Sequence, residues 1–141
     1  MFEALGRQTL HLRRKDDTMR YMMLIKSEEE GAGPAEGPSQ QMMEEMGRLF
    51  EEMTKAGVLL DTAGLSPTAE STQLQWDRGK LTVVDGPFTE AKEVVGGYAI
   101  VQAKSKEEAQ EWATRFVRLH GEDWAITAEV RRIDEPPEDW T

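Results

Sequence analysis

Two stretches of the chain are apolar on both faces of an extended strand. Residues 20–26 carry large apolar side chains that alternate between the faces, with Tyr21, Met23 and Ile25 on one and Met22 and Leu24 on the other. Residues 94–103, VVGGYAIVQA, repeat the pattern. Such strands are typical of a sheet that is covered on both sides. The pattern therefore predicts two central strands that each need cover on two faces.

Two further stretches repeat apolar residues with helical spacing. The first follows Ser39, a suitable N-cap, and ends at Gly57; the second follows Ser105, which forms a capping box with Glu108. The apolar stripes comprise Met42, Met43, Met46, Leu49, Phe50 and Met53 in the first, and Ala109, Trp112, Ala113, Phe116 and Val117 in the second. Methionines at this spacing favour core packing against a sheet, or else an adaptable ligand surface. We interpret them as core packing.

The remaining segments are short strands separated by turns. Residues 58–68 form a strand that ends in a Gly/Pro turn, and residues 71–77 and 80–85 form a hairpin with glycine in its turn. Residues 125–133 are more polar and suit an edge strand. The glycine pair at 96 and 97, inside a strand, predicts a bulge or the close approach of another backbone or a ligand.

The predicted order is β–α–β–hairpin–β–α–β. Two helices can cover only one face of the antiparallel sheet that these strands form. The second apolar face then needs cover, and the chain has no third helix to supply it. The simplest solution is a second copy about a two-fold axis, so the pattern predicts a homodimer.

Composition and charge narrow the class of protein. The 141 residues fit one domain, with no cysteine for disulfides or thiolate metal sites. A net charge of −10 opposes nucleic-acid binding. No apolar run is long enough to span a bilayer, and the N-terminus lacks the apolar core of a secretory signal. We therefore expect a cytoplasmic protein that binds neither nucleic acid nor membrane.

Three regions are expected along the chain. Residues 1–18 are a polar extension, either disordered or the result of a misassigned start at a site upstream of Met19; a basic segment that contacts a partner is the alternative. Residues 19–133 form the folded domain. Residues 134–141 form an acidic tail, which Pro136 and Pro137 keep from strand pairing.

Four segments carry a family resemblance: MRYMMLIK, AGVLLDTAGLSPT, VVDGPFTEAKEVVGGYAIVQAKSKEEAQEWA and ITAEVRRI. They resemble the YCII-related proteins, and more narrowly the DGPF-domain branch, whose motif stands here as Asp85-Gly86-Pro87-Phe88. The resemblance covers roughly residues 19–133. It implies an α+β, ferredoxin-like βαββαβ fold with an inserted hairpin, which pairs as a dimeric α/β barrel. It also implies a pocket between sheet and helices, close to the motif.

The resemblance does not fix a reaction. Members of the wider family include a dehydrochlorinase-type enzyme that uses a histidine–aspartate pair, with the histidine near the start of the first helix. Here the matching segment reads SQQMMEEM, and the histidines are His11 and His120. The chain therefore departs from that pattern. DGPF-domain proteins are commonly encoded beside extracytoplasmic-function sigma factors, which suggests a functional link to such a factor.

Several residues near the motif are candidates for chemistry. Asp85 either opens a turn or acts as a carboxylate at a pocket rim, and with Glu93 it forms the best remaining acid/base pair. Lys92 could hold a substrate anion. The candidate ligand-binding set is Lys92, Tyr98, Gly96 and Phe88. His120, at a helix C-terminus, favours a capping role. No residue spacing indicates a metal site, and no cofactor is expected.

Two functions remain in view, and whether the protein is an enzyme stays open. In the first, it is an accessory or regulatory module that binds a small molecule through a pocket near the motif. In the second, it is a small cofactor-free enzyme of lyase, dehydrochlorinase or hydrolase type that uses Asp85 and Glu93. The absence of the family's histidine favours the first.

Overall fold

The computed structural model describes residues 18–136 and shows one α+β unit. The helices are α2 (Gln40–Lys55) and α3 (Lys106–Arg118). The strands are β1 (Met19–Ser27), β2 (Leu59–Gly64), β3 (Thr72–Asp77), β4 (Lys80–Asp85), β5 (Val94–Ala103) and β6 (Thr127–Arg132). Two short 3₁₀ turns, η1 (Thr68–Glu70) and η2 (Gly121–Asp123), complete the set. The predicted order of elements is confirmed. The predicted extension lies, apart from Thr18, outside the described residues.

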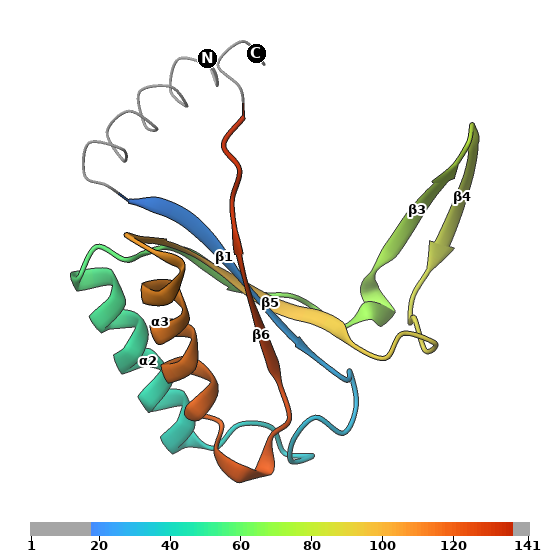
Figure 1. Cartoon of the computed structure of the whole chain (residues 1–141). Helices are drawn as coiled ribbons and strands as arrows, with labels where there is room; N and C mark the ends of the chain where they lie inside the picture. Colours follow the sequence, from blue (N-terminus) through green and yellow to red (C-terminus); the bar gives the residue numbers. More distant parts are fainter. Residues whose placement is uncertain (1–17, 137–141) are drawn as a thin grey trace.

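The main sheet has four strands in the order β2-β5-β1-β6, all antiparallel to their neighbours. Strands β1 and β5 are the two strands that the sequence predicts to be central. Both helices lie on one side of the sheet, where α2 and α3 run beside each other (Figure 1). No helix of residues 18–136 is long and apolar enough to cross a bilayer.

The core lies between this sheet and the two helices. Side chains from β1 and β5 form its floor, and Val101 at its centre is 0% exposed. The buried cluster comprises Tyr21, Met23, Leu49, Met53, Val58, Ala99, Val101, Ala103, Ala109 and Ala113. Tyr21 and Met23 lie in this core and Ile25 packs against it, so the predicted division of β1 into two faces is confirmed.

Side-chain caps fix where the helices begin. The Ser39 hydroxyl oxygen accepts a hydrogen bond from the Met42 amide at 3.1 Å, and that of Ser105 accepts one from the Glu108 amide at 3.1 Å. Glu108 in turn accepts a hydrogen bond from the Lys104 amide. The two predicted N-caps are therefore correct, while the predicted capping box differs in that Glu108 bonds to the amide of Lys104 and not to that of Ser105. The apolar stripe of α2 differs at Met43, which is 56% exposed. One residue turns a helix by about 100°, so of these two neighbouring methionines only Met42 is buried.

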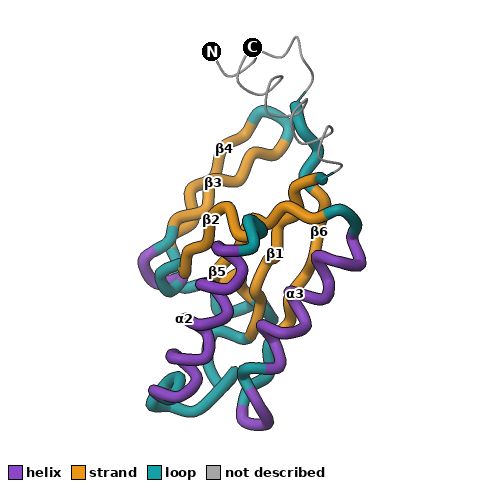
Figure 2. Tube along the Cα trace, turned by 90° about the vertical axis from the view of Figure 1, so that its left-hand side faces the viewer, coloured by secondary structure: helices purple, strands orange, loops and turns teal. Residues whose placement is uncertain are grey.

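Strands β3 and β4 form a separate two-stranded hairpin. Its turn is Arg78-Gly79, with φ of 47° and 95°, so both residues have the left-handed backbone that a tight type I′ hairpin turn requires. The predicted hairpin is confirmed. Figures 1 and 2 show that it projects from the main sheet on the side opposite to α2 and α3.

The second face of the main sheet has no helix over it within the described chain (Figure 1). It carries Met22, Leu24 and Ile100, which are half-buried and which we call the uncovered sheet face. The sheet is open and forms no closed barrel in the single chain. Cover by a second copy stays a prediction.

Candidate functional site

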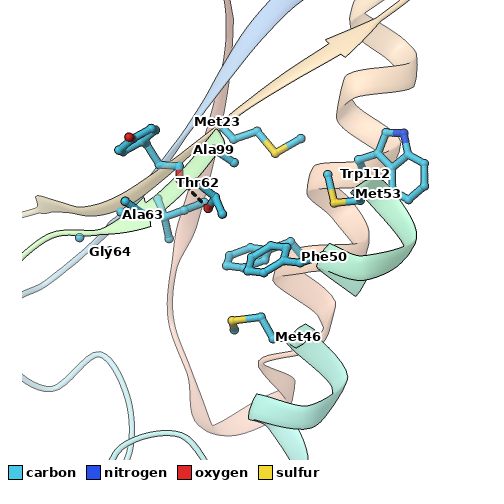
Figure 3. Close-up of a pocket in the computed structure, with 14 residues that line it drawn as sticks. Met23, Met46, Phe50, Met53, Thr62, Ala63, Gly64, Ala99 and Trp112 are labelled. Carbon is cyan, nitrogen blue, oxygen red and sulfur yellow. Dashed lines mark hydrogen bonds between the residues drawn. The ribbon is translucent and has the colours of Figure 1, made fainter. Parts of the chain in front are cut away.

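A cavity of about 270 Å³ lies between the main sheet and the two helices (Figure 3). Its walls come from α2, α3, β1, β2 and β5. The lining residues are Met23, Ile25, Met46, Phe50, Met53, Thr62, Ala63, Gly64, Gly96, Gly97, Tyr98, Ala99, Trp112 and Phe116. No charged side chain is among them, so the cavity is predominantly apolar.

The helical wall follows from the spacing of large residues in the sequence. Met46, Phe50 and Met53 recur at intervals of four and three along α2, so they share one face of that helix. Trp112 and Phe116 are four apart on α3. The rings of Phe50 and Phe116 stack with centroids 6.0 Å apart and an interplanar angle of 14°. The wall is therefore a set of aromatic rings and thioethers, which suits an apolar ring.

The floor of the cavity is made of small residues. On the helix-facing side of β5, side chains shrink along the strand from Val101 to Ala99 to Gly97. Ile25 of β1 pairs with Gly97, and the next residue, Lys26, pairs with Val95. Gly96 therefore has no partner on β1 and is the extra residue of a bulge. The predicted bulge is confirmed. The helices span a sheet whose side chains become too small to fill the space, and the cavity is what remains.

Polar groups at the wall already have partners. The Thr62 hydroxyl donates to the Tyr98 carbonyl oxygen at 2.8 Å (Figure 3), and the Gly96 carbonyl accepts from the Leu65 amide at 2.9 Å. The Tyr98 hydroxyl donates to the Asp61 carboxylate at 2.9 Å, and this bond raises the pKa of Tyr98. Since Ala99 faces the helices, strand alternation turns the Tyr98 ring to the other face.

The residues predicted for acid/base chemistry lie elsewhere. Asp85 is exposed and accepts a hydrogen bond from the Thr72 hydroxyl at 3.0 Å. Glu93, also exposed, accepts one from the Thr127 hydroxyl at 3.4 Å. Lys92 is exposed too, and none of the three lines the apolar cavity. Within residues 18–136 no hydrogen bond joins Asp85 to Glu93, and no group of three acidic or histidine side chains could hold a metal ion.

The rest of the motif packs against the turn η1. The Gly86 amide donates to the Ser71 carbonyl at 2.8 Å, and the amide of Phe88, whose ring is buried, donates to the Thr68 hydroxyl oxygen at 3.3 Å. A Cβ on Gly86 would lie 1.6 Å from the Thr68 carbonyl oxygen. The motif therefore holds the hairpin base against η1 by close backbone contact.

The acidic loop after β1 is attached to the same turn. The Glu29 carboxylate accepts hydrogen bonds from the amide and the hydroxyl of Thr68, and these bonds lower its pKa. A second, more polar hollow of about 480 Å³ lies here, with Glu29, Pro87 and Gly96 in its walls. Among the predicted ligand-binding residues, Gly96 thus borders both hollows.

His120 stands behind the aromatic wall. Its Nδ1 lies 3.1 Å from the Phe116 carbonyl oxygen, and its ring contacts those of Phe116 and Trp124 edge-on at 5.1 and 5.6 Å. Burial lowers its pKa. This position fits the predicted cap on the C-terminal turn of α3 and gives His120 no place in the cavity wall. His11 lies outside the described residues.

Sequence reasoning placed the pocket near the motif and missed the residues that form most of the apolar cavity. The signal was present in the methionines and aromatics of the two helical stripes, which we interpreted as core packing. Met46, Phe50 and Trp112 do face the sheet, as that interpretation expects. The residues opposite them on β5 are too small to meet them.

Comparison with known proteins shows to which family the chain belongs. The chain is 31% identical over 74 residues to an uncharacterized protein of Rhizobium meliloti (strain 1021), a match that covers 52% of this chain and 60% of that protein. The chain thus matches less than two thirds of that relative's length. The family model of the YCII-related domain matches residues 19–120, which is most of the described chain. The protein therefore belongs to the YCII-related domain family.

Proposed function

We propose that this protein binds a small, neutral, aromatic molecule in the cavity between α2, α3 and the sheet, and that it acts as an accessory or regulatory binding module. The observation that carries the proposal is the cavity itself, about 270 Å³ with no charged side chain in its wall. Ligand sites are commonly concave, apolar and largely preformed.

The size and polarity of the cavity define the class of ligand. An apolar cavity of about 150 Å³ is large enough to bind benzene. The larger volume here suits one fused pair of rings. A charged group would lose its hydration without gaining a partner, because the polar atoms of Thr62 and Gly96 are already hydrogen-bonded. A neutral bicyclic ring is the ligand that this wall favours.

Binding is favoured over acid/base catalysis because of where the carboxylates lie. A general base must come within hydrogen-bond reach of the proton that it removes. Asp85 and Glu93 do not line the cavity, and each is hydrogen-bonded to a threonine hydroxyl instead. A lyase or hydrolase that used them would need its substrate outside the apolar cavity.

The proposal includes a homodimer. The strand order β2-β5-β1-β6, with both helices on one side, supports a ferredoxin-like βαββαβ unit with β3 and β4 inserted. Such a unit leaves one sheet face open. Met22, Leu24 and Ile100 form an apolar centre on that face, flanked by Arg131, Glu129 and Asp61 on the neighbouring strands. The sheet of a second copy, packed across a two-fold axis, would cover it as in a dimeric α/β barrel.

The ligand proposal is tested with indole as the probe and saturation-transfer NMR as the readout. Met46→Trp fills the cavity from α2, whereas Met43→Trp places the same ring on the exposed side of the same helix. We expect indole to bind the wild type and M43W equally, and M46W at least tenfold more weakly. Indole-3-acetate, which adds a negative charge, should bind the wild type more weakly than indole. Equal indole binding by M46W and M43W would contradict the proposal.

A further inference from the structure

The hairpin formed by β3 and β4 has one strongly apolar face. Leu74 pairs directly with Val83, and Trp76 pairs with Leu81, and directly paired residues lie on the same side of a two-stranded sheet. Leu74 is 69% exposed and Trp76 is 71% exposed. Leu81 and Val83 are also more than half exposed. These four residues are called here the apolar hairpin face.

The other side of the hairpin is mostly polar. Gln75 pairs with Thr82, Gln73 with Val84, and Asp77 with Lys80. The two sides thus differ as the buried and solvent faces of a strand pair do. The apolar hairpin face has the composition of a buried surface, although residues 18–136 leave it open.

The hairpin has little support from the other described residues. Figures 1 and 2 show β3 and β4 extending away from the main sheet and from both helices. Its base is fixed by the motif, where the Gly86 amide bonds to Ser71, but its outer part has no layer behind it. A two-stranded hairpin alone is marginal in water and needs packing on another element. A partner that covers the apolar face would supply that packing.

We propose that the apolar hairpin face docks on a second copy of this chain, so that each subunit of a two-fold dimer contributes its hairpin to the other. The proposal rests on the homodimer proposed above for the sheet and adds a second contact to it. The hairpin projects on the same side of the main sheet as the uncovered sheet face. One two-fold operation that covers the sheet therefore brings the hairpins to the partner as well.

The exposed area of the apolar hairpin face is large enough for docking on a second copy. A fully exposed leucine or tryptophan presents on the order of 200 Å², so the four side chains expose roughly 500 Å² together. A patch of that size is at the upper end for a monomer. In a two-fold pair each chain both inserts a hairpin and receives one. The buried surface then reaches the roughly 1,200–2,000 Å² that a specific interface needs, before the sheet contributes.

Charge also favours a contact through these residues. Each subunit carries a net charge of −10, so most surfaces of two copies repel each other. The four residues of the apolar hairpin face carry no charge. Asp85 lies on the same side at the hairpin base, where its carboxylate accepts a hydrogen bond from the Thr72 hydroxyl. The hairpin tip carries both signs, with Asp77, Arg78 and Lys80. The hairpin is therefore a part of the surface that two copies can bring together without like-charge contact.

The test is sedimentation equilibrium on the full chain over a range of concentrations. Trp76→Ser with Leu81→Ser removes one cross-strand pair of the apolar hairpin face. Gln75→Ser with Thr82→Ser changes the neighbouring pair on the opposite face and is the matched control. We expect a dimeric wild type, a dissociation constant at least tenfold higher for W76S/L81S, and a control within twofold of wild type. An unchanged constant for W76S/L81S would overturn the proposal.

A further variant separates this proposal from the sheet pairing. Leu24→Asp places a charge on the uncovered sheet face and leaves the hairpin intact. Loss of the dimer in L24D, with W76S/L81S unchanged, supports sheet pairing and overturns hairpin docking. Loss of the dimer in W76S/L81S, with L24D unchanged, supports hairpin docking and overturns the sheet pairing. A monomeric wild type overturns both.

A second measurement does not depend on the folding of the serine variants. The chain has no cysteine, so Thr82→Cys gives a single site for a nitroxide label on the polar side of the hairpin. T82C that carries the nitroxide but no ¹⁵N is mixed with ¹⁵N-labelled wild type. Selective broadening of partner resonances supports docking on a second copy. A spectrum without selective broadening at concentrations where the dimer forms would refute it.

Discussion

Replacing Gly86 by alanine tests whether the DGPF motif is a structural contact. A Cβ at this position would lie 1.6 Å from the carbonyl oxygen and 2.6 Å from the carbonyl carbon of Thr68. Both atoms belong to the backbone of η1, so no side-chain rotation can relieve the overlap. To reach an ordinary contact, the base of the hairpin or η1 must move by more than an ångström.

The cost can be estimated from the contacts that such a movement disturbs. Overpacking of a well-packed site costs typically 1–3 kcal/mol, and a backbone obstacle puts this one at the upper end, about 3 kcal/mol. The shift also strains the hydrogen bond from the Gly86 amide to the Ser71 carbonyl, worth about 1 kcal/mol. Because the contact lies at the hairpin base, part of this cost appears as local opening of β3 and β4 before global unfolding.

The matched control is Gly47→Ala in the middle of α2. Apart from the adjoining residues and the backbone of its own helix, no atom lies within 4 Å of a Cβ built there, and Gly47 is helical. Alanine in an open helical position stabilises by about 0.5–1 kcal/mol relative to glycine. The same chemical change should therefore destabilise at Gly86 and stabilise at Gly47.

Urea unfolding followed by circular dichroism measures both variants at one fixed protein concentration, because dimerisation would shift the midpoint. Amide hydrogen exchange of β3 and β4 in G86A measures the local opening of the hairpin. We expect a lower midpoint and faster exchange in the hairpin. A G86A protein with wild-type stability and wild-type exchange in β3 and β4 would refute the structural account of the motif.

Three further predictions concern the stability that a buried valine, a buried histidine and an ion pair contribute. Val101→Ala should cost about 2–3 kcal/mol in urea unfolding, because Val101 is fully buried, whereas Met43→Ala on the exposed side of α2 should leave the unfolding midpoint nearly unchanged. Burial lowers the pKa of His120 below its ordinary 6.5, so the unfolded chain takes up this proton before the folded one. Stability should then fall as the pH drops through that value, and in His120→Leu a pH series of melting temperatures should lose this part of the slope. Arg20→Gln breaks the bidentate pair with Glu135, at 2.7 and 2.8 Å, and should lower the melting temperature by a few degrees in low salt and by less in 1 M sodium chloride.

Local patterns predicted the fold because each acts over a few residues. The two-faced alternation of β1 and β5 identifies the central strands whatever lies around them. Ser39 and Ser105 define helix starts through bonds to amides three residues on. Arg78-Gly79 fixes a two-residue turn because both need positive φ. These signals are local, and the structure confirms them.

The cavity could not be predicted in the same way because it depends on residues far apart in the chain. Trp112 on α3 and Met46 on α2 are ordinary core residues by pattern. They line a space because Ala99 and Gly97 on β5 are too small to fill it. Sequence gives the size of each side chain but not which side chains oppose one another. Asp85, conversely, has the chemistry of a site residue, and only the fold shows that the Thr72 hydroxyl is its partner.

The motif and the cavity are nonetheless connected, through the start of β5. Contacts of Gly86 and Phe88 with η1 fix where the chain leaves the hairpin, and that chain re-enters the sheet at Val94. Two residues later the bulge at Gly96 lets β5 change register against β1. A Cβ on Gly97 would lie only 3.0 Å from the Ala63 carbonyl oxygen, so β2 and β5 meet there backbone to backbone. The wall at this end is consequently bare main chain. The motif thus contributes to the cavity by placing the strand that forms its floor, while its own side chains stay outside.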